Sequence, residues 1–301
     1  METYILQLFN GISVSSIYML AALGLAITFG LMKVINMAHG EFIMIGAYAT
    51  YVIQNIFLHY VDKSLFGYYF VAAIPVAFLI AGAMGFLLEC VVIKHLYGRP
   101  LDSMLATWGI SLVLQQLARS IFGAPNVDVK SPGWLDGALL ISQGLQFPYK
   151  RLFIIALVIA CIIGVFVLLY KSKYGIRIRA VMQNREMAAS LGINTRLVDA
   201  YTFAVGSGIA GIAGCALTLL GSVGSTIGTY YIVDTFMVVV LGGVGTLLGT
   251  IAGGLVIGTA NTTFEFFTNT SLGKVLVFTL VILFLQWRPK GLFTINSRSL
   301  D

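Results

Sequence analysis

Most of this chain consists of apolar runs long enough to cross a membrane as helices. A spanning α-helix needs about 20 apolar residues to cover about 30 Å of hydrocarbon. Backbone N–H and C=O groups must be paired inside lipid, so these runs predict helices rather than open strands. The runs occupy residues 5–32, 41–59, 69–93, 103–122, 152–170, 197–220, 231–267 and 274–287.

Basic residues predict the orientation of the helices. Six Lys or Arg residues lie between positions 171 and 196, where Glu186 is the only acid. Such an excess of positive charge is typical of cytoplasmic loops. Counting outward from this loop places the N-terminus outside and the C-terminus in the cytoplasm. The C-terminal segment supports this side because it carries Arg288, Lys290 and Arg298.

Termini on opposite sides require an odd number of crossings, so the long run at 231–267 must supply an even number. The segment Leu241-Gly242-Gly243-Val244-Gly245 is the expected bend. We therefore predict an all-α, polytopic transmembrane helix bundle with about eight to nine passes. A re-entrant hairpin in place of two full passes is the alternative for 231–267.

The whole chain, residues 1–301, is interpreted as one transmembrane domain. Its longest external segment is 123–151, where prolines and glycines predict an ordered loop or a short surface helix. The halves on either side each place glycine-rich helices around a break, so an internal repeat is an open hypothesis.

Composition restricts the class of protein. Hydrophobic residues make up 58% of the chain and charged residues 10%, and the mean hydropathy is +0.94. A soluble chain of this length needs far more polar surface. These values exclude a cytosolic enzyme, a disordered protein and a disulfide-stapled secreted domain. The net charge of +6 follows from basic cytoplasmic loops and indicates no nucleic-acid partner.

The sequence offers no catalytic constellation. The three histidines lie on different segments, and the three cysteines have neither metal nor redox spacing. The glycine-rich segment 243–249 lacks the Gly-Lys-Ser/Thr of a phosphate-binding loop. We therefore expect a non-enzymatic chain without metal or cofactor, which does not itself hydrolyse ATP.

A short polar break separates the first two apolar runs. Asn36, His39 and Glu41 lie in this break, with only a few residues between the flanking helices. A polar break at membrane depth exposes backbone groups and helix ends, which transporters use to bind solutes. The alternative is a tight cytoplasmic turn capped by Asn36.

The basic loop at 171–196 contains a second distinctive segment, 185–194. It predicts a short amphipathic helix that ends at Gly192 or Asn194. Small side chains there would let another protein approach closely, whereas a solvated loop held by lipid headgroups is the alternative. The residues of this predicted contact are Arg185, Glu186, Ala188, Ala189 and Gly192.

Several motifs resemble a known family. The pattern Glu-x-Ala-Ala-x-x-Gly, which runs from Glu186 to Gly192, resembles the coupling loop of ATP-binding-cassette importer permeases. Asn-Met-Ala-His-Gly-Glu at 36–41 is similar to the signature of permeases for branched-chain amino acids. Further similar segments lie at 105–112, 240–245 and 286–292, so the resemblance covers essentially the whole chain.

Within this family the chain looks most like the urea-importer branch, at 114–127 and 228–234. The resemblance implies a permease subunit that translocates urea from an external binding protein. A branched-chain amino acid or a short amide is the alternative solute. The alternative from another class is a stand-alone channel or secondary carrier.

The resemblance also implies partners and a location. The partners would be a homologous second permease, paired as a heterodimer, two cytoplasmic ATPase subunits, the binding protein and membrane lipid. The location would be the bacterial inner membrane. The expected substrate-pathway residues are Asn36, His39, Glu41, Trp108, Gly242, Gly243 and Gly245.

Overall fold

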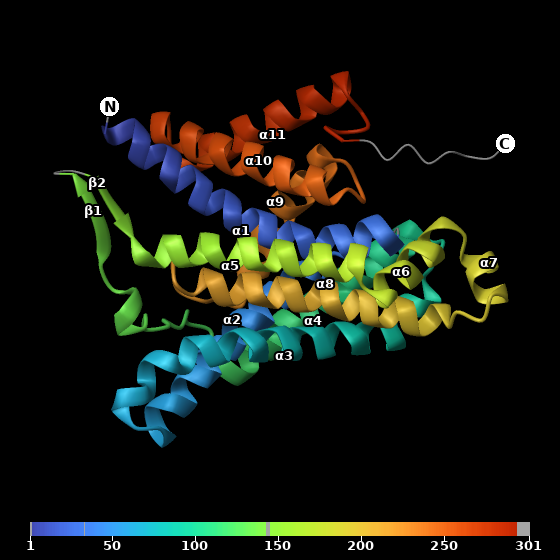
Figure 1. Cartoon of the computed structure of the whole chain (residues 1–301), viewed down its shortest axis with the longest axis horizontal. Helices are drawn as coiled ribbons and strands as arrows, with labels where there is room; N and C mark the ends of the chain where they lie inside the picture. The colour runs from blue at the N-terminus through green and yellow to red at the C-terminus, as the bar shows by residue number, and fades with distance from the viewer. Residues whose placement is uncertain (1, 33, 143–144, 294–301) are drawn as a thin grey trace.

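The computed structural model describes residues 2–32, 34–142 and 145–293. Eleven α-helices run through these residues, most of them along one direction (Figure 1). They are α1 (Glu2–Met32), α2 (His39–Tyr60), α3 (Tyr69–Val91), α4 (Pro100–Phe122), α5 (Tyr149–Phe166), α6 (Lys173–Gln183), α7 (Arg185–Ser190), α8 (Thr195–Leu217), α9 (Ile227–Gly242), α10 (Leu247–Phe267) and α11 (Thr270–Trp287). The predicted all-α polytopic bundle is confirmed.

Seven helices in the described part of the chain are long and apolar enough to cross a membrane. Two further helices correspond to predicted passes. Helix α9 is shorter, with 16 residues, and α4 is amphipathic because a row of polar side chains follows one of its faces. The seven segments are Tyr4–Gly30, His39–Tyr60, Leu65–His95, Tyr149–Lys171, Thr195–Leu217, Leu247–Phe267 and Thr270–Trp287.

The long apolar run at 231–267 forms two helices, α9 and α10, around a tight turn. Gly243 and Gly245 have φ angles of +103° and +84°, a region that side chains other than glycine rarely occupy. The turn also brings the backbones of Gly242 and Gly249 into contact. The bend lies where the sequence predicts it and the run forms two helices, while the choice between two full passes and a re-entrant hairpin stays a prediction.

Helix α8 lies at the centre of the bundle and packs against α1, α2 and α3 (Figure 1). Glycines permit the close approach: Gly206 meets Gly24 of α1, and Gly211 meets Gly46 of α2. Small residues at such crossings let helix backbones touch and gain van der Waals contact in lipid. A second apolar cluster joins α1 to α9, α10 and α11.

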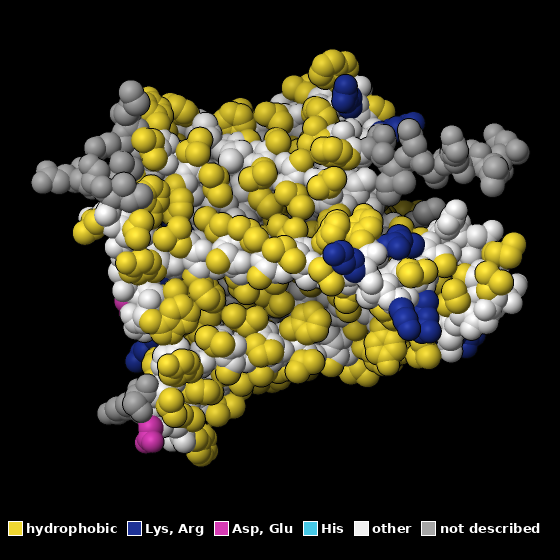
Figure 2. Space-filling model, in the orientation of Figure 1, with side chains coloured by type: hydrophobic (Ala, Val, Ile, Leu, Met, Phe, Trp, Pro, Cys, Tyr) yellow, Lys and Arg dark blue, Asp and Glu magenta, His cyan; other side chains and the backbone are white. Residues whose placement is uncertain are grey.

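The two ends of the bundle differ. One end carries the antiparallel strands β1 (Ala138–Ser142) and β2 (Leu145–Pro148), and the opposite end carries α6 and α7 (Figure 1). The described residues of the predicted loop 123–151 form two paired strands and one short 3-10 turn, Gly133–Leu135, before α5 begins, and Val127 pairs with Val223. Figure 2 shows apolar side chains along the flank and Lys and Arg side chains over the α6 end.

Candidate translocation site

Helix α2 begins in the interior of the bundle rather than at its end. The His39 Nε2–H donates to the carbonyl oxygen of Ala21, at 3.1 Å. Eleven residues separate Ala21 from Met32, the last residue of α1. At about 1.5 Å per residue, α2 therefore starts about 16 Å along α1 from its end. The geometry favours a polar break at membrane depth over a turn at the helix end.

Asn36 shapes the break without capping α2. Its Oδ1 accepts a hydrogen bond from the backbone N–H of Ala38, at 3.0 Å, which closes a local Asx turn. The next backbone donor, Met37 N–H, bonds to Thr107 Oγ1 of α4 at 3.0 Å. The break is therefore held by a side chain of its own and by one from α4.

Glu41, in the first turn of α2, faces the polar side of α4. Its Oε1 accepts hydrogen bonds from Ser111 Oγ at 2.8 Å and from Gln115 Nε2 at 2.9 Å. Gln115 Nε2 also donates to Thr229 Oγ1 at 2.9 Å, at the start of α9. These three helices together form the α2–α4–α9 site, which consists of Asn36, Glu41, Thr107, Ser111, Gln115 and Thr229.

The α2–α4–α9 site contains buried polar atoms that lack a partner among the described residues. Glu41 is 1% exposed and Asn36 is fully buried, yet Glu41 Oε2 and Asn36 Nδ2 form no hydrogen bond. A buried polar group without a partner is costly, and ionisable groups within membranes are commonly functional. The site thus presents a free acceptor and a free donor.

His39 does not belong to the same site. Residues 39 and 41 point about 200° apart on an α-helix, so Glu41 faces α4 while the His39 ring packs beside Gly24 of α1. The ring also lies edge to face with Phe42. Of the three polar residues of the break, Glu41 thus bonds to α4, Asn36 bonds to the backbone of the break itself, and His39 points into the core.

Trp108 lies on α4 next to Thr107, and 52% of its surface is exposed. It lines an open apolar groove of about 380 Å³. The groove's other residues are Met37, Leu101, Met104 and Leu105. Trp108 is therefore a neighbour of the break, on the outer surface of α4.

The predicted pathway glycines lie elsewhere. The turn of Gly242, Gly243 and Gly245 packs against Gly30 of α1, and Leu292 N–H donates to the Leu241 carbonyl oxygen at 2.8 Å. Gly30 lies nine residues beyond the level of His39 on α1, or about 14 Å. The structure places these glycines in the backbone contacts of the α9–α10 turn rather than beside Glu41, and their part in the solute pathway stays a prediction.

The polar partners of Glu41 on α4 were missed in the sequence. The signal was a four-residue spacing of polar side chains within an otherwise apolar segment, which places them on one helix face. The members of this row are Ser103, Thr107, Ser111 and Gln115. Thr229 gave no comparable signal, because only the fold brings α9 beside α4.

At the opposite end, α7 is a short helix with well-defined ends. The Asn184 side chain accepts from Met187 N–H at its start. At its end Gly192 adopts φ +82°, and Ile193 N–H and Gly192 N–H bond back to the carbonyls of Ala188 and Ala189, a Schellman arrangement. The prediction of a short helix ended by Gly192 is confirmed.

Residues of the predicted contact differ in exposure. Glu186 and Ala189 are exposed, whereas Ala188 is buried against α6 and α8. Met187 and Leu191 project apolar surface, being 58% and 75% exposed. Exposed apolar side chains on a short helix at the basic end of the bundle are typical of a protein–protein contact.

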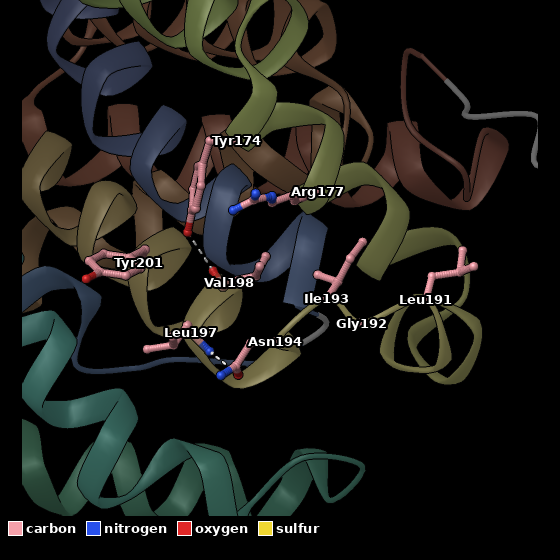
Figure 3. Close-up of a pocket in the computed structure, with 9 residues that line it drawn as sticks. All are labelled: Tyr174, Arg177, Leu191, Gly192, Ile193, Asn194, Leu197, Val198 and Tyr201. Carbon is pink, nitrogen blue, oxygen red and sulfur yellow. Dashed lines mark hydrogen bonds between the residues drawn. The ribbon is translucent and has the colours of Figure 1, made fainter.

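A cleft of about 420 Å³ lies behind α7, between α6 and α8 (Figure 3). The Tyr174 hydroxyl donates to the Val198 carbonyl oxygen at 3.0 Å across its inner wall. Burial raises the pKa of Tyr174 to about 12, so the hydroxyl stays protonated and keeps donating. Leu191 and Gly192 lie at the side of the cleft nearest to α7, and Arg177 projects from α6 (Figure 3).

Comparison with known proteins identifies relatives over nearly the full length. The family described as branched-chain amino acid transport system, permease component, matches residues 7–285. The permease LivH of Salmonella typhimurium is 30% identical over 96% of this chain and 95% of its own length. BraD of Pseudomonas aeruginosa is 28% identical over the same shares.

A more distant relative is LivM of Escherichia coli, which is 26% identical over 96% of this chain and 70% of its own length. No solved structure matches the chain. The relatives are named for branched-chain amino acids, so the urea preference expected from the sequence is not confirmed, and the alternative solute is the better supported. Taken with seven apolar helices, these matches show that the chain is a multi-pass membrane protein of the permease-component family of branched-chain amino acid transport systems.

Proposed function

We propose that this chain is the membrane-spanning subunit of an ATP-driven importer in the bacterial inner membrane and that it translocates branched-chain amino acids. The family match and the names of the relatives support the solute. The solute passes beside the α2–α4–α9 site, at the face that the chain shares with a second, homologous permease.

The observation that carries the proposal is the interior start of α2. An interrupted helix places unpaired polar groups at membrane depth, where a closed apolar bundle has none. Glu41 and Asn36 supply such groups, and both side chains are buried. A protein that served only as a membrane scaffold would gain nothing from leaving them without partners.

The partners follow from the two unlike ends. The basic end with α6 and α7 faces the cytoplasm, and ATPase subunits dock on the exposed side chains of α7. The end with the β1–β2 hairpin faces outward and receives the solute from a binding protein. The N-terminus then lies outside and the C-terminus inside. ATP-driven movement of α7 shifts the bundle between states that differ in affinity for the solute.

Urea is the second candidate solute, and one observation favours it. Gln115 and Thr229 belong to the segments 114–127 and 228–234, which resemble the urea-importer branch, and both line the α2–α4–α9 site. The segments that carry the resemblance thus contribute Gln115, which donates to Glu41, and Thr229, which accepts from Gln115.

Transport by the complete complex tests the proposal. The complex of both permeases and the ATPases is reconstituted into vesicles with ATP enclosed, and binding protein and radiolabelled leucine or urea are added outside. Leucine should accumulate above its external concentration only with ATP and binding protein. Accumulation of urea without uptake of leucine would identify urea, not a branched-chain amino acid, as the transported solute. Equilibration of either solute by the purified chain alone, without ATP, would establish a channel or carrier instead.

A further inference from the structure

We propose that the free oxygen of Glu41 accepts a hydrogen bond from an N–H group of the transported solute, while Asn36 donates to an oxygen of the same solute. The α2–α4–α9 site would then select molecules that carry an ammonium or amide N–H together with a carboxylate or carbonyl oxygen. This inference rests on the proposed function and names the chemistry of its binding site.

The first step concerns how the carboxylate is held. Two donors from α4, Ser111 Oγ at 2.8 Å and Gln115 Nε2 at 2.9 Å, both bind the same oxygen, Oε1. They fix the carboxylate and leave Oε2 without a partner among the described residues. A carboxylate oxygen can only accept, so its missing partner is a donor.

The second step concerns the missing donor. Glu41 is 1% exposed, so bulk water does not reach Oε2 to donate a hydrogen bond to it. Hydrogen bonds to a charged acceptor are about twice as strong as neutral ones, and a low-dielectric surrounding strengthens them further. An N–H group of a passing solute satisfies Oε2 at that depth. A solute with only acceptors leaves the carboxylate unsatisfied and is rejected.

The third step concerns the complementary donor. The Oδ1 of Asn36 accepts a hydrogen bond from the backbone N–H of Ala38, so the side-chain nitrogen, Nδ2, is the atom that has no partner among the described residues. Asn36 is fully buried, and it lies on the same break as Glu41. A solute carboxylate or carbonyl oxygen is the partner that an amide N–H requires.

The fourth step concerns Gln115, which joins all three helices of the site. Its Nε2 donates both to Glu41 on α2 and to Thr229 on α9. Movement of α4 relative to α2 and α9 breaks these bonds and frees the carboxylate to rotate. Gln115 is therefore a positioning residue: it sets the affinity of the site and does not itself need to touch the solute.

The test uses the reconstituted complex with four variants of the permease. Glu41→Gln keeps the shape of the side chain and removes its charge, and Glu41→Ala removes the acceptor. Asn36→Ala removes the donor, and Gln115→Leu removes the amide that holds the carboxylate. Glu265→Gln is the matched control, because Glu265 is a carboxylate on another helix, α10, bonded to Asn261. Uptake of leucine and urea, and the KM and maximal rate of each, are measured at equal amounts of assembled complex.

Glu41→Gln should raise the KM for leucine at least tenfold, because the ammonium loses a charged partner. For urea, a neutral amide, the rise should stay below about threefold, since Gln retains an acceptor oxygen. Glu41→Ala should abolish uptake of either solute, and Gln115→Leu should raise KM with little change in maximal rate.

Unchanged KM in Glu41→Gln and in Asn36→Ala would overturn the inference, and so would an equal effect of Glu265→Gln. If Glu41→Ala fails to assemble, the isosteric Glu41→Gln decides alone. A wild-type complex that transports neither leucine nor urea would instead contradict the proposed function, so the two failures are distinguishable.

Discussion

Arg185 of α7 forms an ion pair with Asp199 near the start of α8, with 2.6 Å between Nη2 and Oδ2. Its guanidinium also lies over the ring of Tyr97, 4.9 Å from the centroid, and the Tyr97 hydroxyl donates to Glu89 Oε1 at 3.2 Å. An arginine expected to contact a partner is thus engaged within the chain. It ties α7 to α8 and to the connection between α3 and α4.

This arrangement predicts that Arg185 and Asp199 transmit movement of α7 to the bundle. Asp199→Asn should lower ATP-driven uptake about tenfold while ATP hydrolysis by the assembled complex continues, because α7 loses its charged link to α8. The measurement is the number of ATP molecules hydrolysed per solute transported. The exchanged pair Arg185→Asp with Asp199→Arg should recover part of the coupling.

Arg196→Ala provides the matched control, since Arg196 is an exposed arginine of the same segment. It should leave the ratio of hydrolysis to transport unchanged. Equal ratios in the wild type and Asp199→Asn would show that the ion pair has no part in coupling.

A second prediction concerns Gly192 at the end of α7. Its φ of +82° is left-handed, so Gly192→Ala should introduce strain of about 1–2 kcal/mol and fray α7. Hydrogen exchange of the backbone amides of Gly192 and Ile193 should accelerate, and ATPase binding should weaken. Gly192→Asn should be milder, because asparagine tolerates this conformation best after glycine. Unaltered exchange in Gly192→Ala would contradict the assignment of the Schellman end.

A third prediction concerns the crossing of α2 and α8. A Cβ added at Gly214 would strike the carbonyl oxygen of Ile43, so Gly214→Ala must push the two helices apart. We expect a loss of about 1–3 kcal/mol, typical of overpacking in a tight core. Thermal unfolding of the detergent-solubilised protein reports the change as a lower Tm.

Gly164 on α5 is the control for that crossing, because nothing lies within 4 Å of a Cβ added there. Gly164→Ala should leave Tm unchanged or raise it. A Tm for Gly214→Ala that equals the wild-type value would show that α2 and α8 do not pack as closely as described.

A fourth prediction concerns the ion pair between Asp234 of α9 and Lys274 of α11, with 3.1 Å between Oδ2 and Nζ. Lys274→Met leaves a buried carboxylate without its cation and should cost about 3 kcal/mol. The double variant Asp234→Asn with Lys274→Met should recover most of that loss, since no unpaired charge remains. Unfolding of Lys274→Met, Asp234→Asn and the double variant in detergent measures the coupling. Additive losses would mean that the two side chains do not interact.

The pattern of apolar and polar residues along the sequence was sufficient to predict the class of fold. Membrane thickness sets the length of an apolar helix, and lipid forbids unpaired backbone groups, so the runs determined the helices before any contact was known. The bend near Gly243 and the end of α7 at Gly192 could also be predicted from local sequence, because left-handed backbone conformations favour glycine.

The tertiary structure alone decided which polar side chains meet. His39 and Glu41 are neighbours in sequence, yet the helical rotation between them sends one toward α1 and the other toward α4. Ser111 and Gln115 become partners of Glu41 only because α4 packs beside the start of α2. Contacts between residues 70 and 74 positions apart depend on how helices cross, and a periodic pattern contains no information about which helix will lie beside a polar face.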